Sequence, residues 1–220
     1  PKSYNSQFGV ALSLWGLSEQ YNLAIIEAGI SEKGEMAKLE SMIKPTIGLL
    51  TNVGVAHKAG FDSKEEKIYE KINLFKDVET MIFPNSYVEH IQLPYRPRKF
   101  SWGYDEGLSL EVYSLKQVDD KFTVATLFYG GRTFAVEIPF VDKGNVENAI
   151  NCVAVMLRFG YEREVIASRI KELQPVAMRL ELKKGKKNSS IIDDSYSNDL
   201  DALQIALEFL NQQGQHPRKI

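Results

Sequence analysis

The chain has 220 residues, of which 44% are hydrophobic, 25% charged and 10% aromatic, the composition of an ordinary globular protein. Its single cysteine, Cys152, excludes a disulfide framework and a cysteine-rich zinc scaffold. With 27 Lys and Arg against 29 Asp and Glu, the net charge of -2 offers no positive field for nucleic acid or an anionic membrane. No apolar run reaches the roughly 18 residues of a membrane span. The polar start lacks a signal sequence and an initiator Met, so we predict a cytoplasmic protein whose ends have been cut.

The first hundred residues alternate between helical and strand patterns. A helix capped by Asn5 or Ser6 is predicted as far as Gly16, and the short apolar run 21–26 is typical of a strand buried in a parallel sheet. A helix over 36–43 stops at Lys44-Pro45. The further predicted elements are a strand over 46–50, a helix over 63–76 and a strand over 80–83. The predicted apolar face of the first helix comprises Phe8, Ala11, Leu12 and Trp15. This order predicts a doubly wound, mostly parallel α/β sheet.

A different pattern begins near Phe100. Segments 108–118, 122–129 and 133–140 are rich in alternating, β-branched and aromatic residues and are separated by turn sequences, which predicts an antiparallel meander added to the sheet. The turns are placed at Asp119-Asp120 and Gly130-Gly131. Two helices are predicted around 146–157 and 164–173.

The last forty residues predict the opening of a second, incomplete domain. Two strands, 179–184 and 189–192, precede a helix with leucines on one face, and too little sequence follows to cover that face. These leucines are Leu200, Leu203, Leu207 and Leu210. We therefore predict a first domain over residues 1–177 and the start of a second over 178–220.

Ionisable residues follow two of the predicted parallel strands. Glu27 closes the strand 21–26 and His57 follows the strand 46–50, and ligands of open parallel sheets bind beyond the carboxyl ends of the strands. A carboxylate and an imidazole there are plausible groups for Mg²⁺. The plainer alternative is that Glu27 caps a helix and His57 lies in a surface loop.

Lys71 is the third residue of interest, because it lies beside the apolar face of its helix, apart from the charged positions 64–67 that we expect to be solvated. Its amine either reaches into the same crevice or extends to water over its apolar stem. The interval from Gly29 to Gly34 has the spacing of a phosphate-binding loop, but Glu35-Met36 stands where Lys and Ser or Thr are required, so this is not a Walker loop.

Seven short motifs, in matching order and spacing, resemble the central domain of the Mur ligases. They are Asn5-Ser6-Gln7-Phe8-Gly9-Val10, Glu27-Ala28-Gly29-Ile30 with Gly34-Glu35-Met36, Thr51-Asn52-Val53-Gly54 with Ala56-His57, Lys71 before Leu74-Phe75, Asn145-Val146-Glu147-Asn148-Ala149, Arg179-Leu180-Glu181, and Asp193-Asp194-Ser195-Tyr196. Gly34-Glu35-Met36 and Asp193-Asp194-Ser195-Tyr196 are most similar to the branch that adds D-alanyl-D-alanine, and the opening also resembles forms fused to alanine racemase.

The resemblance implies a segment of an ATP-dependent amide ligase of peptidoglycan synthesis. Such enzymes activate a carboxylate of UDP-N-acetylmuramoyl-tripeptide as an acyl phosphate, which the amine of D-alanyl-D-alanine attacks. The family carries a phosphate-binding loop and a uridine-nucleotide domain before the region that resembles this chain, and most of a Rossmann-like domain after it. We therefore expect the isolated chain to be inactive.

The same resemblance implies roles for particular residues. Glu27, His57 and Lys71 would hold Mg²⁺, with Lys71 carbamylated by CO₂. The family's nucleotide contacts fall on Asn148 and Arg179, its ribose contact on Asp194, and its phosphate or substrate contact on Asn5.

The sequence departs from the family at two places. Gly144 replaces a frequent His, so Asn145 is predicted to serve only as a helix cap and Asn148 is preferred as the nucleotide contact. Ser197-Asn198-Asp199-Leu200 replaces Asn-Ala-Asn-Pro, and Asn198 with Asp201 is predicted to form a capping box. Arg179 could alternatively be a surface strand residue. Two other functions stay open: a folylpolyglutamate synthetase-like ligase and a non-catalytic scaffold segment of a multidomain protein.

Overall fold

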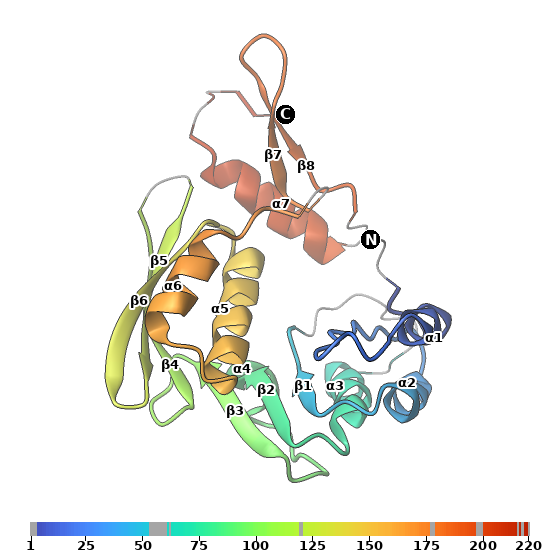
Figure 1. Ribbon diagram of the computed structural model, residues 1–220. Coiled ribbons are helices and arrows are strands. Elements are labelled where there is room, and N and C mark those ends of the chain that lie inside the picture. The colour runs from blue at the N-terminus through green and yellow to red at the C-terminus, as the bar shows by residue number, and fades with distance from the viewer. Residues whose placement is uncertain are drawn as a thin grey trace. The chain divides into compact units, whose positions relative to one another are not determined.

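The computed structural model describes residues 4–52, 61, 63–118, 121–176, 179–196, 200–214, 216 and 218–219 (Figure 1). The helices are α1 (Gln7–Trp15), α2 (Glu35–Ile43), α3 (Lys64–Ile72), α4 (Asn85–Val88), α5 (Lys143–Arg158), α6 (Arg163–Lys171) and α7 (Leu200–Gln212), with a 3₁₀ turn η2 (Asn73–Phe75). The strands are β1 (Ile47–Leu49), β2 (Thr80–Pro84), β3 (Arg98–Gly103), β4 (Leu110–Gln117), β5 (Thr123–Tyr129), β6 (Arg132–Ile138), β7 (Glu181–Lys184) and β8 (Ser190–Asp193).

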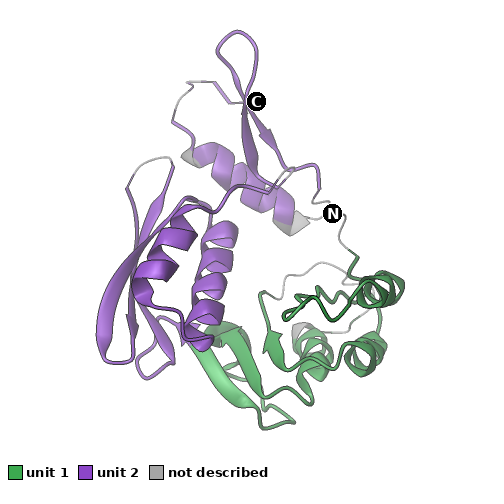
Figure 2. Ribbon diagram, viewed as in Figure 1, with its two compact units in different colours: residues 1–101 green, residues 102–220 purple. Residues whose placement is uncertain are grey.

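The strand order confirms the predicted fold class. Six strands are hydrogen-bonded in the order β1-β2-β3-β4-β5-β6, while β7 and β8 form a separate antiparallel sheet. The pairs β1–β2 and β3–β4 are parallel, and the pairs β4–β5 and β5–β6 are antiparallel. The chain divides into two compact units, unit 1 over residues 1–101 and unit 2 over residues 102–220 (Figure 2), and each is described by itself.

Unit 1 is held together by two apolar clusters. The first joins the β1 and β2 region to α3, η2 and α4 and contains Leu50, Ile68, Ile72, Phe75, Val78, Met81, Phe83 and Val88. The second lies among α1, α2 and neighbouring loops and contains Val10, Ile30, Met36, Leu39 and Phe61. Leu74 packs against both clusters. In β1, the lack of a side chain at Gly48 allows Phe75 to lie directly against the strand, because a Cβ there would overlap the Phe75 ring.

The predicted helix α1 forms, but it buries a different face from the one predicted. Ser6 caps it by accepting a hydrogen bond from the Gly9 amide, and it ends at Trp15. Phe8 and Trp15 are 76% and 91% exposed, whereas Gly9 and Val10 are buried. The reason is steric, since a Cβ on Gly9 would lie 2.8 Å from the backbone of Tyr4, so the helix packs through its smallest residue.

The predicted strand over 21–26 is wrong. This segment has no strand assignment, and Leu23 and Ile25 are 56% and 88% exposed. In the described part of the chain, β1 is an edge of the six-stranded sheet and no strand pairs with 21–26. An apolar run alone does not supply the hydrogen-bonding neighbour that a strand requires.

In unit 2 the observed strands and helices lie close to those predicted from the sequence. The three strands of the meander form where predicted, and β5 and β6 are joined at Gly130 and Gly131, whose φ angles of 57° and 77° suit a tight hairpin turn. Helix α5 buries its predicted apolar side, Val146, Ala149, Ile150, Val153 and Leu157. The turn predicted at Asp119-Asp120 lies outside the described residues.

The β7–β8 hairpin and α7 also form as predicted. On α7, Leu203 and Leu207 are more than half exposed, while Phe209 is buried. The capping box expected at Asn198 lies outside the described residues. Two elements were not predicted: β3, which begins in a basic segment, and the single-turn helix α4. None of the described helices is both long and apolar enough to cross a bilayer.

Candidate functional site

Glu27 and Asn5, two of the predicted site residues, are in direct contact. The Asn5 side-chain amide donates to Glu27 Oε1 at 3.1 Å, and the Gly29 amide donates to the Asn5 carbonyl at 2.8 Å. A Cβ on Gly29 would lie 2.9 Å from Asn5 Nδ2, so glycine is needed for this approach. Glu27 is exposed, and its carboxylate is oriented by Asn5 from the segment before α1.

The loop between Gly29 and Gly34 is organised around a carboxylate of the chain itself. Glu35 Oε2 accepts hydrogen bonds from the backbone amides of Ser31 and Glu32 at 2.6 and 2.9 Å. Gln7 donates to the other oxygen of Glu35 at 3.2 Å. The two backbone bonds are the main cause that lowers the pKa of Glu35. Amides that a phosphate-binding loop would offer to its ligand are thus occupied by Glu35.

Glu70, which the sequence analysis missed, joins this loop to α3. Its Oε1 accepts from the amides of Gly34 and Met36 at 2.8 and 3.1 Å and so caps the start of α2. Gly34 has a φ of 81° and offers no side-chain cap. Because Glu70 immediately precedes Lys71, this cap fixes the position of the predicted catalytic lysine relative to α2. A helix cap supplied from a distant segment leaves no local sequence signal.

Lys71 reaches the carboxyl end of β1. Its Nζ donates to the Asn52 carbonyl at 3.3 Å, and Asn52 opens the segment that contains His57. Burial lowers the pKa of the Lys71 ammonium, and the neighbouring Lys67 lowers it further. A larger share of neutral amine follows, and this is the form that reacts as a nucleophile. The prediction that Lys67 is solvated is wrong, since only 7% of it is exposed.

His57 lies outside the described residues, so the meeting of Glu27, His57 and Lys71 at one ion stays a prediction. Among the described residues, no group of three or more His, Cys, Asp or Glu side chains is arranged to hold a metal. What unit 1 does show is an exposed, oriented carboxylate and a half-buried amine with a lowered pKa. Of the two, the carboxylate is of the ligand type that Mg²⁺ prefers.

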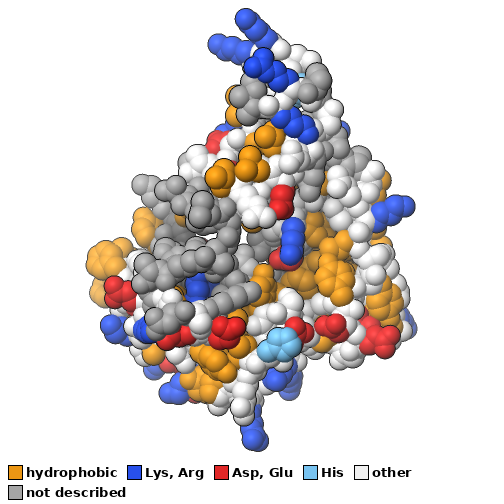
Figure 3. Space-filling view, turned by 180° about the vertical axis from the view of Figure 1, so that it is seen from behind, with side chains coloured by type: hydrophobic (Ala, Val, Ile, Leu, Met, Phe, Trp, Pro, Cys, Tyr) orange, Lys and Arg blue, Asp and Glu red, His pale blue; other side chains and the backbone are white. Residues whose placement is uncertain are grey.

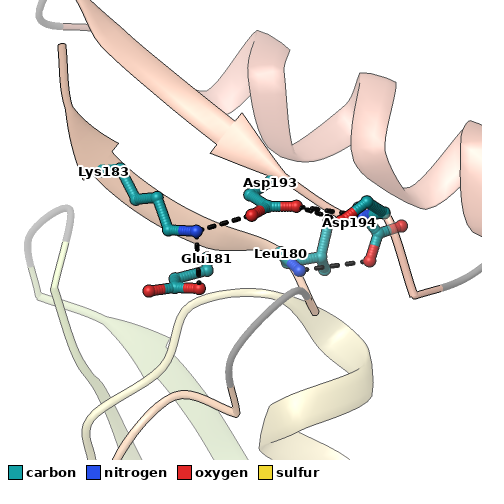
Figure 4. Close-up of polar contacts among 6 residues, drawn as sticks. Leu180, Glu181, Lys183, Asp193 and Asp194 are labelled. Carbon is teal, nitrogen blue, oxygen red and sulfur yellow. Dashed lines mark hydrogen bonds and ion pairs between the residues drawn. The ribbon is translucent and has the colours of Figure 1, made fainter.

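In unit 2, the β7–β8 hairpin brings two predicted motifs together (Figure 4). Asp194 Oδ1 accepts a hydrogen bond from the Leu180 amide at 3.1 Å. The Arg179 guanidinium lies 4.3 Å from the centre of the Tyr196 ring, a cation–π distance. These contacts join the Arg179-Leu180 segment to the Asp194–Tyr196 segment across the antiparallel β7–β8 pair, although the two segments are distant in sequence.

Asp193 is engaged in a separate surface cluster. Lys183 donates to Asp193 at 2.5 Å and forms an ion pair with Glu181 at 3.1 Å, and the Ser195 hydroxyl donates to Asp193 at 2.6 Å (Figure 4). These contacts, led by the one from Lys183, lower the pKa of Asp193 to about 2. Asp193 is therefore a structural anion of the hairpin, whereas Asp194 accepts from the Leu180 amide.

On α5, Asn145 and Asn148 differ in their surroundings. Asp142 is the N-cap residue and accepts from both the backbone and the side chain of Asn145, at 2.8 and 2.9 Å. The expectation that Asn145 serves the helix cap is therefore right in part, since it supports the cap but is not the N-cap itself. Asn148 is exposed, as a ligand contact requires.

On the face shown in Figure 3, acidic and basic side chains are interspersed with hydrophobic ones.

The fold and these contacts define a mixed α/β protein with a lysine at the carboxyl end of a parallel strand and a cluster of ionisable groups along a separate hairpin. The chain belongs to the Mur ligase family, because residues 1–156 match the Mur ligase middle domain. It is 28% identical over 211 residues to the UDP-N-acetylmuramoyl-tripeptide--D-alanyl-D-alanine ligase of Bacillus subtilis, a match covering 94% of this chain and 45% of that protein.

Solved structures share the fold. MurF from Acinetobacter baumannii superposes with a TM-score of 0.82 at 21% identity, covering 97% of this chain and 48% of that one. MurF ligase from Thermotoga maritima in complex with ADP gives 0.80 at 22% identity, covering 96% and 50%. Folylpolyglutamate synthase from Thermotoga maritima gives a lower TM-score of 0.63 at 15% identity, covering 88% and 44%. The chain spans about half the length of the relatives it matches.

Proposed function

We propose that the complete polypeptide in which this chain occurs is an ATP-dependent amide ligase of peptidoglycan precursor synthesis. It would join D-alanyl-D-alanine to UDP-N-acetylmuramoyl-tripeptide through an acyl phosphate. The observation that carries the proposal is the match to the Bacillus subtilis ligase over 94% of this chain, which includes the motifs of both units. Membership of the Mur ligase family and the higher TM-scores of the MurF structures support it.

For unit 1 we propose a metal site made by Glu27, His57 and a carbamylated Lys71. Mg²⁺ at this site would supply positive charge for the phosphate oxygens of ATP and of the acyl phosphate. Asn5 orients the Glu27 carboxylate, which is exposed and available as a ligand. The half-buried Lys71 amine, with its lowered pKa, is suited to react with CO₂. Carbamylation replaces a cation that would repel metal with a carboxylate that attracts it. By resemblance, Asn5 also contacts phosphate or substrate.

For unit 2 we propose that Arg179, Asp194 and Asn148 bind ATP. The Arg179 guanidinium lies over the Tyr196 ring, which orients the plane of its N–H donors. One carboxylate oxygen of Asp194 accepts from the Leu180 amide, and the carboxylate has a second oxygen. A carboxylate suits the ribose hydroxyls, and a guanidinium suits phosphate or the base edge. Asn148 offers both a donor and an acceptor from the exposed side of α5.

We further propose a domain boundary near residues 177 and 178. The family match ends at residue 156, within the first proposed domain. The β7–β8 pair forms its own sheet, apart from the six-stranded one, as the start of a second domain requires. The ATP site would then use residues from both domains, with Asn148 in the first and Arg179 and Asp194 in the second.

A ligation assay on the complete polypeptide tests the proposal. With ATP, Mg²⁺ and UDP-N-acetylmuramoyl-tripeptide, we expect ADP release and an amide product that depend on D-alanyl-D-alanine. A folylpolyglutamate synthetase would instead require a folate acceptor and glutamate. A folded protein that consumes no ATP under either condition would support the scaffold alternative and contradict the proposal.

A further inference from the structure

A series of hydrogen bonds connects the segment before β3 to the start of α2. The Tyr95 hydroxyl donates to Asn73 Oδ1 at 3.1 Å, and Asn73 Nδ2 donates to Glu70 Oε2 at 3.4 Å. The other oxygen of Glu70 accepts from the amides of Gly34 and Met36 at 2.8 and 3.1 Å. An ionised carboxylate only accepts hydrogen bonds, so Asn73 must turn its nitrogen to Glu70 and its oxygen to Tyr95. The series therefore fixes the orientation of the Glu70 carboxylate.

Glu70 occupies the positive end of α2. The first amides of a helix have no partner within it, and Gly34, the N-cap residue, has no side chain that could accept from them. A carboxylate is favourable there, because it forms charge-assisted hydrogen bonds and interacts with the helix dipole. Glu35, in the first turn of α2, accepts instead from the amides of Ser31 and Glu32. The last turn of α3 is thus held against the start of α2 by Glu70.

The same turn of α3 carries Lys71. Successive residues of a helix point about 100° apart, so Glu70 and Lys71 leave α3 in different directions. Glu70 reaches α2, whereas Lys71 Nζ donates to the Asn52 carbonyl at 3.3 Å, beyond the end of β1. A shift of α3 against α2 would therefore move the Lys71 amine away from the place that it occupies at β1.

A second set of contacts joins α2 to the Glu27 carboxylate. Glu35 accepts from the side chain of Gln7 at 3.2 Å. Gln7 is two residues after Asn5, which donates to Glu27 at 3.1 Å. The proposed metal ligands Glu27 and Lys71 are therefore both linked to the start of α2, the lysine through its neighbour in α3.

We propose that Glu70 is a positioning residue of the metal site, and that the Tyr95–Asn73 pair holds it in place. The inference rests on the proposed metal site. The Glu70 carboxylate is directed to α2, so its role is to set the separation between Lys71 and Glu27 and not to bind the ion. Metal sites require their ligands within about 0.5 Å of the productive geometry. Loss of a residue that orients a ligand commonly weakens metal binding by about 10- to 100-fold.

Binding of Mn²⁺ to the complete polypeptide, measured from the EPR signal of the free ion, tests the inference without relying on ligase activity. Mn²⁺ takes the same carboxylate and water ligands as Mg²⁺. Glu27→Gln should abolish the binding and so assign it to the proposed site. Glu70→Ala should raise the Kd for Mn²⁺ about tenfold. Glu70→Gln keeps an oxygen that can accept from the two α2 amides and should recover most of this loss. Tyr95→Phe, which removes one hydroxyl, should raise the Kd about threefold.

Ser63→Ala is the matched control, because it removes a cap from α3 itself. The Ser63 hydroxyl accepts from the Glu66 amide at 3.0 Å, at the end of α3 away from Lys71. We expect Ser63→Ala to lower the thermal midpoint about as much as Glu70→Ala does and to leave the Kd for Mn²⁺ unchanged.

A folded Glu70→Ala protein with the wild-type Kd would overturn the inference and leave Glu70 a helix cap. An equal rise in Ser63→Ala would also overturn it, because the loss would follow stability. An equal rise in Glu70→Gln would overturn it as well, because the loss would follow charge and not position.

The remaining outcomes separate the parts of the proposal. An unchanged Kd in Tyr95→Phe overturns the role of the Tyr95–Asn73 pair and, if Glu70→Ala does not fold, the inference as a whole. Wild-type protein that binds no Mn²⁺, or binding that Glu27→Gln leaves intact, would overturn the proposed metal site together with the inference. Binding that Glu27→Gln abolishes and Glu70→Ala leaves intact would overturn the role of Glu70 alone.

Discussion

Lys71 in unit 1 and Asp193 in unit 2 both have shifted pKa values, but the physical causes differ. For Lys71 the main cause is burial beside the apolar clusters, with Lys67 adding to it. For Asp193 the causes are hydrogen bonds from Lys183 and Ser195 on an exposed hairpin. The pKa of the lysine therefore depends on packing of the core, whereas the pKa of the aspartate depends on a few surface partners. Substitutions should separate these two causes.

The largest expected effect comes from removing the amine itself. Lys71→Ala should lower kcat for ligation about 100-fold or more, because the proposed site loses a ligand of the Mg²⁺ that would stabilise charge on the transferring phosphoryl oxygens. Product formation by the complete polypeptide measures it, and Lys76→Ala, at an exposed position, is the control. A Lys71→Ala enzyme that is folded and fully active would remove Lys71 from the site.

The packing that supports Lys71 can be disturbed from a distance. Gly48→Ala places a Cβ against the Phe75 ring, so either β1 or η2 must shift. We expect a loss of about 1–3 kcal/mol in the free energy of unfolding, the usual cost of overpacking a core. Gly107→Ala, where no atom lies within 4 Å of the added Cβ but φ is 82°, provides a contrast in unit 2. Urea denaturation measures both, and a Gly48→Ala protein as stable as wild type would show that the core tolerates the shift.

The sequence predicted the elements of unit 1 better than it predicted which faces are buried. Helices α2 and α3 and strands β1 and β2 were found because their apolar spacing matches the faces that they bury. For α1 the same method chose the wrong face, because contact through Gly9 leaves no apolar signal. The run 21–26 was equally misleading, since periodicity carries no information on whether a neighbouring strand is present.

For the candidate site, too, the sequence indicated some features and not others. Motif resemblance located Asn5, Glu27, Lys71, Arg179 and Asp194, and the structure shows local contacts for each of them. It did not indicate the capping role of Glu70, because the capped amides are more than thirty residues away. The burial of Lys67 was also missed, since a charged residue amid other charged residues is expected to be solvated.

On the hairpin, a single change at Arg179 should have a moderate effect. Arg179→Ala removes a guanidinium that the Tyr196 ring holds in place, and we expect the KM for ATP to rise about tenfold, with a smaller change in kcat. Arg179→Lys should recover little, because an ammonium lacks the planar fork of donors. Initial rates at varied ATP measure the effect. An unchanged KM in both variants would favour the alternative that Arg179 is a surface strand residue.

The smallest effect is expected at Asp193 and is best measured as a titration. Because the folded pKa of about 2 lies below the ordinary value of 3.8, the paired carboxylate stabilises the hairpin above about pH 4, and this contribution is lost as the pH falls toward 2. Lys183→Met removes the first cause of the shift, so the NMR-monitored titration of Asp193 should move up toward its ordinary value. Lys184→Met, the next residue on β7, should leave the midpoint unchanged. If Asp193 still titrates with a midpoint near 2 in Lys183→Met, the Ser195 hydrogen bonds, and not the ion pair, are the main cause of its lowered pKa. Activity should be unaffected by either change, since the stabilisation of this exposed cluster is local and screened by water.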